Sequence, residues 1–202
     1  MRSTFFFAAL LLTAALAALL VERHRTATTS AVATRGTATL VGDSLNVGVE
    51  PYLPDALPHW KIVANDRVGR TTDEGIDELE AGRPALSSYV VVSLGTNDPA
   101  DVRGFGADVA RVLELIGPNR CVIWATIWRN GKPDDAFNDV LRNAAAGNRR
   151  LRLVEWAQLV QAHPDWLAGD HLHGNETGYR ERARAVAAAT NSCTPAVNLT
   201  AQ

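Results

Sequence analysis

Short apolar runs recur along the chain after residue 36, separated by segments whose apolar residues fall at helical spacing. The runs mostly lack strict alternation of apolar and polar residues, which is typical of parallel strands covered by helices on both faces. They lie at residues 37–41, 61–65, 89–94, 121–127 and 151–156. Because strands and helices alternate, we expect a three-layer α/β/α sandwich with a central five-stranded parallel sheet.

Helical signals fill the segments between these runs. Thr71 and Glu74 have the spacing of a capping box at the start of one helix. Asp98 and Pro99 would supply the cap and the first-turn proline of the next helix. The apolar residues expected on one face are Phe105, Val109, Val112 and Ile116 in that helix, and Phe137, Val140, Leu141 and Ala144 in the one after it. A last helix is expected over residues 177–190.

The N-terminus has a different pattern from the rest of the chain. Residues 5–21 are apolar except for Thr13, with arginines before and after them. The length of this run is intermediate between that of the apolar core of a signal peptide and that of a short membrane-spanning helix. The expected organisation is a signal peptide or uncleaved signal anchor at 1–21, a polar linker at 22–36, one globular domain at 37–190 and a tail at 191–202. We therefore expect an extracytoplasmic protein, either secreted or attached to the membrane at the cell envelope through this segment.

Composition narrows the class of protein further. The chain has 202 residues, 47% of them hydrophobic, and a formal net charge of -2. These values suit a globular domain, and without a basic stripe nucleic acid is not an expected partner. Cys121 opens an expected strand and Cys193 follows the last expected helix, which would end near the amino edge of the sheet. A disulfide between them is a hypothesis that would suit an exported protein.

Polar residues and glycines follow four of the expected strands, at the edge where open α/β sheets form their active sites. These segments are Gly42-Asp43-Ser44, Val68-Gly69-Arg70, Gly95-Thr96-Asn97-Asp98 and Asp170-His171-Leu172-His173. Ser44 is either a helix N-cap or a nucleophile at a strand-to-helix turn. Asp170 stands three positions before His173, so in a compact loop its carboxylate reaches Nδ1 and leaves Nε2 free to face Ser44.

The order of these segments resembles that of one hydrolase family. The sequence lacks the GxSxG elbow of α/β-hydrolases, because Asn46 stands where the second glycine would be. The resemblance is to the four sequence blocks of the SGNH (GDSL) hydrolase family, and it is carried by GDSL at 42–45, Gly69, GTND at 95–98 and D-x-x-H at 170–173. It covers about residues 37–190 and implies the flavodoxin-like SGNH hydrolase fold.

The resemblance also implies roles for individual residues. Ser44 would be the nucleophile, His173 the general base, and Asp170 the residue that orients His173. The oxyanion hole would consist of the backbone N–H groups of Ser44 and Gly69 and the side-chain amide of Asn97. Together these residues would form a Ser-His-Asp triad with three oxyanion donors, an arrangement that catalyses acyl transfer.

The loop that carries the histidines leaves a choice of base. His171 stands where the family commonly has glycine, so it is an alternative base, although the spacing from Asp170 favours His173 and makes His171 a rim or substrate-facing residue. Trp128 and Arg129, after the fourth strand, are candidate substrate-binding residues. Asp170 and the two histidines are also potential metal ligands, but no further ligand cluster accompanies them. We therefore expect neither a metal nor a cofactor.

The expected function is that of an SGNH/GDSL-type serine esterase that forms an acyl-enzyme. Since no insertion is long enough to form a large lid, short acyl groups such as acetyl, on a small ester or an acylated envelope glycan, are expected first. The alternatives are a lipase or thioesterase, an O-acyltransferase acting on envelope glycan, and a non-catalytic glycan-binding module. Because an imidazole must be neutral to act as a base, activity is expected to rise through about pH 6–7.

Overall fold

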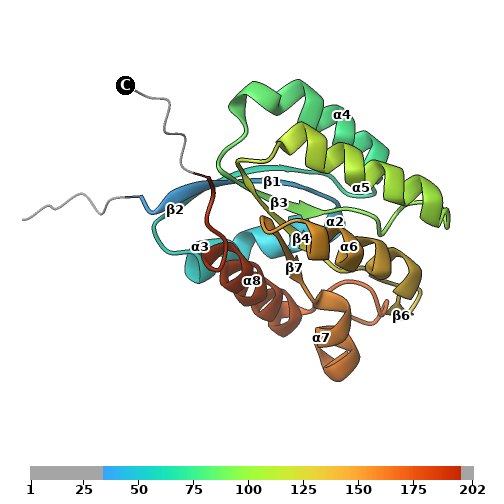
Figure 1. Cartoon of the computed structure of the whole chain (residues 1–202). Coiled ribbons are helices and arrows are strands. Elements are labelled where there is room, and N and C mark those ends of the chain that lie inside the picture. The colour runs from blue at the N-terminus through green and yellow to red at the C-terminus, as the bar shows by residue number, and fades with distance from the viewer. Residues whose placement is uncertain (1–33, 197–202) are drawn as a thin grey trace, which may run out of the picture. The chain divides into compact units, whose positions relative to one another are not determined.

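The computed structural model describes residues 34–196, and in it five parallel strands form one sheet (Figure 1). The strands are β1 (Gly36–Gly42), β2 (Trp60–Asp66), β3 (Tyr89–Ser93), β4 (Cys121–Ala125) and β7 (Leu151–Val154). Their order across the sheet is β2-β1-β3-β4-β7, with every neighbouring pair parallel. Helices cover both faces, so the three-layer α/β/α sandwich expected from the sequence is confirmed.

Two groups of helices form the outer layers. One face of the sheet is covered by α4 (Thr72–Gly82), α5 (Val102–Ile116) and α6 (Asp135–Gly147). The other is covered by α2 (Ser44–Val49), α3 (Leu53–Ala56), α7 (Trp156–Ala162) and α8 (Glu176–Asn191). Within residues 34–196, short 3-10 helices lie at Glu50–Tyr52, Arg83–Ala85 and Pro164–Trp166, and a small hairpin pairs β5 (Trp128–Arg129) with β6 (Lys132–Pro133).

Neighbouring residues of the central strands enter opposite cores. In β1, Leu40 packs into the core under α8, whereas Val41 packs into the core under α4 and α5. In β4, Ile123 and Trp124 divide in the same way, and both are fully buried. Both faces of these strands therefore need apolar residues, which explains why the apolar runs show no alternation.

Two helix starts test the signals in the sequence. The capping box of α4 is present, because the Thr71 side chain accepts from the Glu74 N–H while the Glu74 carboxylate accepts from the Thr71 N–H. The expected cap of the next helix is wrong: α5 begins at Val102, and Asp101 caps it. Asp98 instead accepts from the Thr72 N–H at 2.8 Å, so this carboxylate serves the start of α4.

The helix faces were predicted better than the element ends. Phe105, Val109, Val112 and Ile116 are all buried, as the helical spacing indicated. The fifth apolar run, in contrast, contains two elements, since β7 ends at Val154 and Trp156 begins α7. A tryptophan followed by alanine fits either a strand or a helix, and so local pattern alone did not place this boundary.

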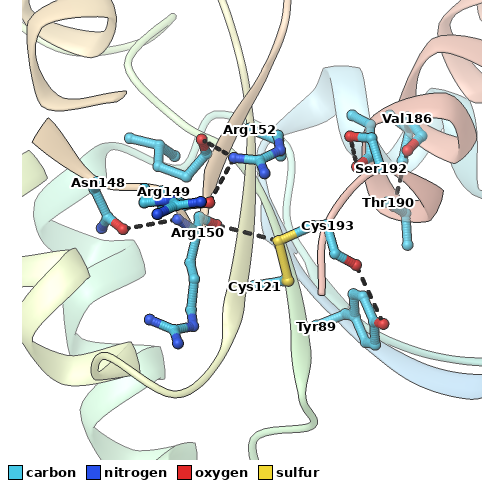
Figure 2. The surroundings of a disulfide bond; sticks show 12 residues. Tyr89, Cys121, Asn148, Arg149, Arg150, Arg152, Val186, Thr190, Ser192 and Cys193 are labelled. Carbon is cyan, nitrogen blue, oxygen red and sulfur yellow. Dashed lines mark hydrogen bonds between the residues drawn. A yellow bond between two sulfur atoms is a disulfide. The ribbon is translucent and has the colours of Figure 1, made fainter. Parts of the chain in front are cut away.

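A disulfide joins Cys121, at the start of β4, to Cys193, just after the end of α8 (Figure 2). Both cysteines are buried, and the Cys193 carbonyl accepts from the Tyr89 hydroxyl at 3.4 Å. The bond that the sequence left as a hypothesis is therefore present. It connects α8 to the amino edge of the sheet, opposite the edge at which the strands end.

Part of the expected organisation lies outside the described residues. This applies to the signal segment at 1–21, to most of the linker at 22–36, and to residues 197–202 of the tail. Within residues 34–196, no helix combines the length and the apolar character needed to cross a bilayer.

Candidate active site

Ser44 is the first residue of α2, and one residue, Asp43, separates it from the end of β1 at Gly42. Asp43, and not Ser44, caps this helix, because its carboxylate accepts from the Leu45 N–H at 2.9 Å. The helix cap, Asp43, and the candidate nucleophile, Ser44, are therefore two neighbouring residues. The Ser44 hydroxyl is left free to contact a base.

The loop before α8 brings a histidine and a carboxylate to this serine. His173 Nε2 lies 2.9 Å from Ser44 Oγ, and His173 Nδ1 lies 2.6 Å from Asp170 Oδ2. The hydrogen bond with His173, followed by those from the backbone N–H groups of Leu172 and His173, lowers the pKa of Asp170 to about 2. Asp170 is therefore ionised at neutral pH and favours the His173 tautomer that carries its proton on Nδ1.

His171 takes a different place in the same loop. Its backbone has a φ of 58°, in the left-handed region that favours glycine, which is the residue the resemblance leads one to expect here. Its carbonyl accepts from Trp128 Nε1 at 2.9 Å. The hydrogen bonds of the loop therefore connect Ser44 and Asp170 through His173, and His171 lies outside that series.

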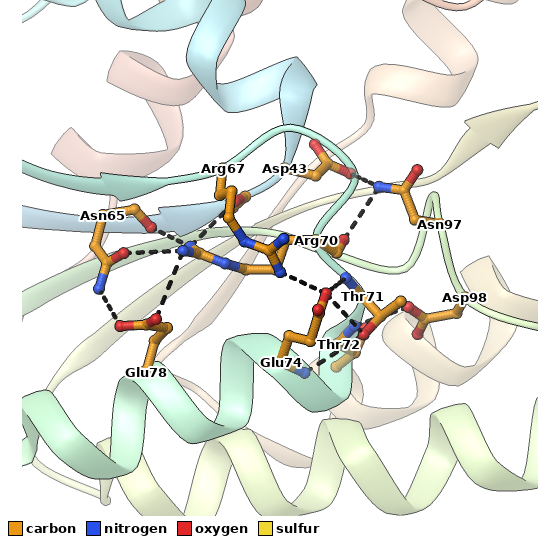
Figure 3. Close-up of polar contacts among 11 residues, drawn as sticks. Asp43, Asn65, Arg67, Arg70, Thr71, Thr72, Glu74, Glu78, Asn97 and Asp98 are labelled. Carbon is orange, nitrogen blue, oxygen red and sulfur yellow. Dashed lines mark hydrogen bonds and ion pairs between the residues drawn. The ribbon is translucent and has the colours of Figure 1, made fainter.

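The two other candidate oxyanion donors follow β2 and β3. Gly69 has a φ of 76°, and a Cβ placed there would meet no atom within 4 Å, so backbone conformation and not space favours glycine. Asn97 Nδ2 donates to the Arg70 carbonyl at 3.1 Å and to Asp43 Oδ2 at 3.4 Å (Figure 3). The Asn97 amide is thereby held beside the turn that presents Ser44.

A buried polar group lies beneath this turn. Arg182 of α8 is 1% exposed, donates from Nη2 to Ser93 Oγ at 2.8 Å and lies over the Trp156 ring. The Ser93 hydroxyl in turn lies 3.5 Å from Asp43 Oδ1. Burial lowers the pKa of Arg182 to about 10, and burial raises the pKa of Asp43, against the Leu45 hydrogen bond and the Arg182 charge. Arg182 thus balances a carboxylate that would otherwise be buried without a cation.

The sequence contains a signal for the burial of Arg182 that the four motifs do not include. Buried residues recur along α8 at helical spacing, at Gly178, Arg182, Val186 and Thr190. An arginine inside such a stripe indicates a buried charge, and a buried charge requires a partner.

The candidate substrate-binding residues separate into two groups. Trp128 and His171 line a cavity of about 650 Å³ beside Asp170. Arg129 is occupied elsewhere: it pairs with Asp134 at 2.6 Å and donates to the Asp98 carbonyl at 2.7 Å. These contacts do not support a substrate-binding role for Arg129, and they attach the β5–β6 hairpin to the loop that carries Asn97.

Asp66, at the end of β2, makes the stability of the folded protein depend on pH. Burial raises its pKa to about 7, the hydrogen bond from Asn46 of α2 opposes this, and the nearby Glu50 raises it further. The ordinary value of 3.8 applies once the chain unfolds, so between about pH 4 and 7 the folded state holds a proton that the unfolded state has released. Ionisation of Asp66 therefore removes stability as the pH rises through this window.

Asp66→Asn should consequently raise the melting temperature at pH 8 and change it little at pH 4. Asparagine keeps the shape and the oxygen that accepts from Asn46, but it cannot ionise. Thermal unfolding at both pH values measures the effect, with Asp55→Asn, which removes an exposed carboxylate of α3, as the control. An Asp66→Asn effect of equal size at both pH values would contradict this account.

Comparison with known proteins supports the fold. No family model and no curated protein matches the chain. Among solved structures, it resembles the C-terminal catalytic domain of peptidoglycan O-acetyltransferase A from Streptococcus pneumoniae, with 22% identity, a TM-score of 0.62, and coverage of 78% of this chain and 91% of that one. It also resembles a lipase/acylhydrolase from Enterococcus faecalis, with 20% identity, a TM-score of 0.65, and coverage of 79% and 97%.

A third similar structure is a member of the lipolytic G-D-S-L family from Veillonella parvula. Here the identity is 18% and the TM-score 0.65, with coverage of 77% of this chain and 98% of that one. At such identities the likeness concerns the arrangement of the chain in space. The chain has the α/β fold of the GDSL (SGNH) lipases and acylhydrolases.

Proposed function

We propose that the protein is a serine esterase that cleaves carboxylic esters through an acyl-enzyme on Ser44. The observation that carries this proposal is the series of hydrogen bonds from Ser44 Oγ to His173 Nε2, at 2.9 Å, and from His173 Nδ1 to Asp170, at 2.6 Å. A serine alone is a weak nucleophile, whereas a serine beside a base that a carboxylate orients is an activated one.

The reaction follows from this geometry. Ser44 Oγ attacks the ester carbonyl carbon while His173 Nε2 takes the hydroxyl proton. The oxyanion accepts from the N–H groups of Ser44 and Gly69 and from the Asn97 amide, which exchanges its longer contact, at 3.4 Å to Asp43, for the oxyanion and keeps the one to the Arg70 carbonyl. The bond to the alcohol then breaks, and His173 gives its proton to the leaving oxygen. Water next attacks the acyl-enzyme and loses a proton to His173. The bond from the acyl carbon to Ser44 Oγ then breaks, His173 returns the proton to Ser44 Oγ, and the carboxylic acid leaves.

For the substrate, we propose a short acyl group such as acetyl, carried by a small ester or an envelope glycan. The connections between strands and helices are short, and the cavity beside Asp170 and His171 is shared with the β5–β6 hairpin and not enclosed by a separate lid. One similar structure is the catalytic domain of a peptidoglycan O-acetyltransferase, and that name favours acyl transfer to a glycan hydroxyl as the second candidate.

We also propose that the protein works outside the cytoplasm, secreted or attached to the membrane through its N-terminal segment. The apolar pattern of residues 5–21 and the Cys121–Cys193 disulfide support this, because disulfides persist in oxidising compartments.

Labelling with a fluorophosphonate tests the enzymatic proposal. Wild type should acquire one covalent phosphonyl group, seen by mass spectrometry, and Ser44→Ala should acquire none. Hydrolysis of p-nitrophenyl esters should be fastest for acetate and fall as the chain lengthens. A folded wild type that is neither labelled nor active would contradict the proposal and favour a glycan-binding module, and a maximum at long chains would contradict the short-acyl assignment.

A further inference from the structure

Arg70 is a buried arginine directly beside a candidate oxyanion donor. It follows Gly69 in the loop after β2, yet it is only 3% exposed. A guanidinium is seldom fully buried unless several acceptors surround it. The groups that accept hydrogen bonds from Arg70 therefore indicate the role of this buried side chain, and Figure 3 shows two of its partners, Asn65 and Glu78.

The side chain connects the ends of two neighbouring strands. Nη1 donates to the Gly42 carbonyl, the last of β1, at 3.2 Å, and also to the Asn65 carbonyl of β2. Nη2 donates to the Asn65 side-chain oxygen at 3.0 Å, with a Glu78 carboxylate oxygen of α4 at 4.0 Å. Gly42 leads directly into the turn that presents Ser44, so the guanidinium fixes that turn against the strand that leads to Gly69.

The backbone of the same residue reaches the third donor. The Arg70 carbonyl accepts from Asn97 Nδ2 at 3.1 Å, a shorter contact than the 3.4 Å between that amide and Asp43. One residue therefore contacts the segments of all three candidate donors: the Ser44 turn through its guanidinium, Gly69 through the peptide bond, and Asn97 through its carbonyl.

We propose that Arg70 is a positioning residue that sets the oxyanion donors relative to one another. This inference rests on the proposed esterase function. Oxyanion donors act only within a narrow range of distances from the developing charge, and displacement of catalytic groups by about 1 Å can cost about 10² in rate. Lysine keeps the charge but lacks the fork that binds Gly42 and Asn65 together.

The chain offers a matched control in the same loop. Arg67 pairs with Glu74 of α4 at 2.7 Å, as Arg70 approaches Glu78, but the Arg67 side chain is 53% exposed and lies outside the candidate site. Its backbone N–H also donates to the Gly42 carbonyl, and alanine keeps that bond. Arg67→Ala thus removes an arginine and an ion pair without removing a contact to the donors.

The test compares Arg70→Lys and Arg70→Ala with Arg67→Ala and with Asn97→Ala. We expect Arg70→Lys to lower kcat about 10–10²-fold with little change in KM. Its affinity for a trifluoromethyl ketone, whose hemiketal oxyanion needs the same donors, should fall by the same factor. Guanidinium ion should restore part of the activity of Arg70→Ala but none of the activity of Asn97→Ala, and Arg67→Ala should behave as wild type.

Two outcomes would overturn the inference. One is a folded Arg70→Lys whose kcat and ketone affinity match those of wild type. The other is independent of catalysis: ¹H–¹⁵N spectra in which the Ser44 and Gly69 amides and the Asn97 side-chain amide do not shift in Arg70→Lys. A wild type that is neither labelled nor active would refute the esterase itself, and the spectra would still decide whether Arg70 positions these groups.

Discussion

Replacing His173 with glutamine should lower kcat/KM for a short-chain ester by about 10⁴-fold or more, because loss of one member of the proposed triad leaves only the contribution of the proposed oxyanion hole and of binding. Glutamine retains a polar group near Ser44, but it cannot take the hydroxyl proton. Steady-state hydrolysis of p-nitrophenyl acetate measures the loss, and circular dichroism checks that the variant is folded.

His171→Gln is the matched variant, since the two histidines lie two positions apart in one loop. His171 lines the cavity beside Asp170 but takes no part in the hydrogen bonds to Ser44. We expect a change of less than about tenfold, mainly in KM, as for a residue that only contacts substrate. The opposite ranking of the two variants would assign the base to His171 and would contradict the structure.

Removing the disulfide should lower the free energy of unfolding by about 4 kcal/mol and leave kcat unchanged. Cys121 and Cys193 are separated by 72 residues, and closing a loop of that length restricts the unfolded chain by about this amount. The bond joins α8 to the amino edge of the sheet, whereas Ser44 and His173 meet at the opposite edge. Stability and activity should therefore respond separately.

Urea unfolding of wild type, with and without a thiol reductant, measures the first effect. The variant with both Cys121→Ala and Cys193→Ala should unfold at the midpoint of reduced wild type and should not respond to the reductant. Its initial rates at 25 °C should equal those of wild type. Identical midpoints for oxidised and reduced wild type would contradict the expected contribution of the bond.

The sheet could be predicted from the sequence because each of its strands is a short apolar run beside a helical pattern. The strand order could not, since the position of β2 beside β1 depends on how helices cross between strands and leaves no mark on either run. The predicted start of α5 was wrong for a related reason. Asp98 has the residue type of a helix cap, but its carboxylate accepts from the Thr72 N–H of another helix, α4.

The candidate site, too, could be predicted from the sequence only in part. Four short motifs placed Ser44, Gly69, Asn97 and the Asp170–His173 pair at strand ends, and the structure brings these residues to one edge. Arg70 and Arg182 are buried next to these residues. The helical spacing of α8 carries a signal for the burial of Arg182, whereas Arg70 lies in a loop, where no pattern in the local sequence reveals that a charged side chain is buried. The sequence also does not show whether a loop arginine such as Arg129 is available to substrate or is paired within the protein, as Arg129 is with Asp134.

The candidate nucleophile and base come from distant parts of the chain. Ser44 follows the first strand, and His173 comes 129 residues later, just before the last helix. A chain that is partly synthesised or partly opened at α8 would hold a nucleophile and its oxyanion donors without a base. Ester turnover is therefore a reporter of the complete domain, and it should vanish when the C-terminal segment detaches, before the central strands lose their protection against hydrogen exchange.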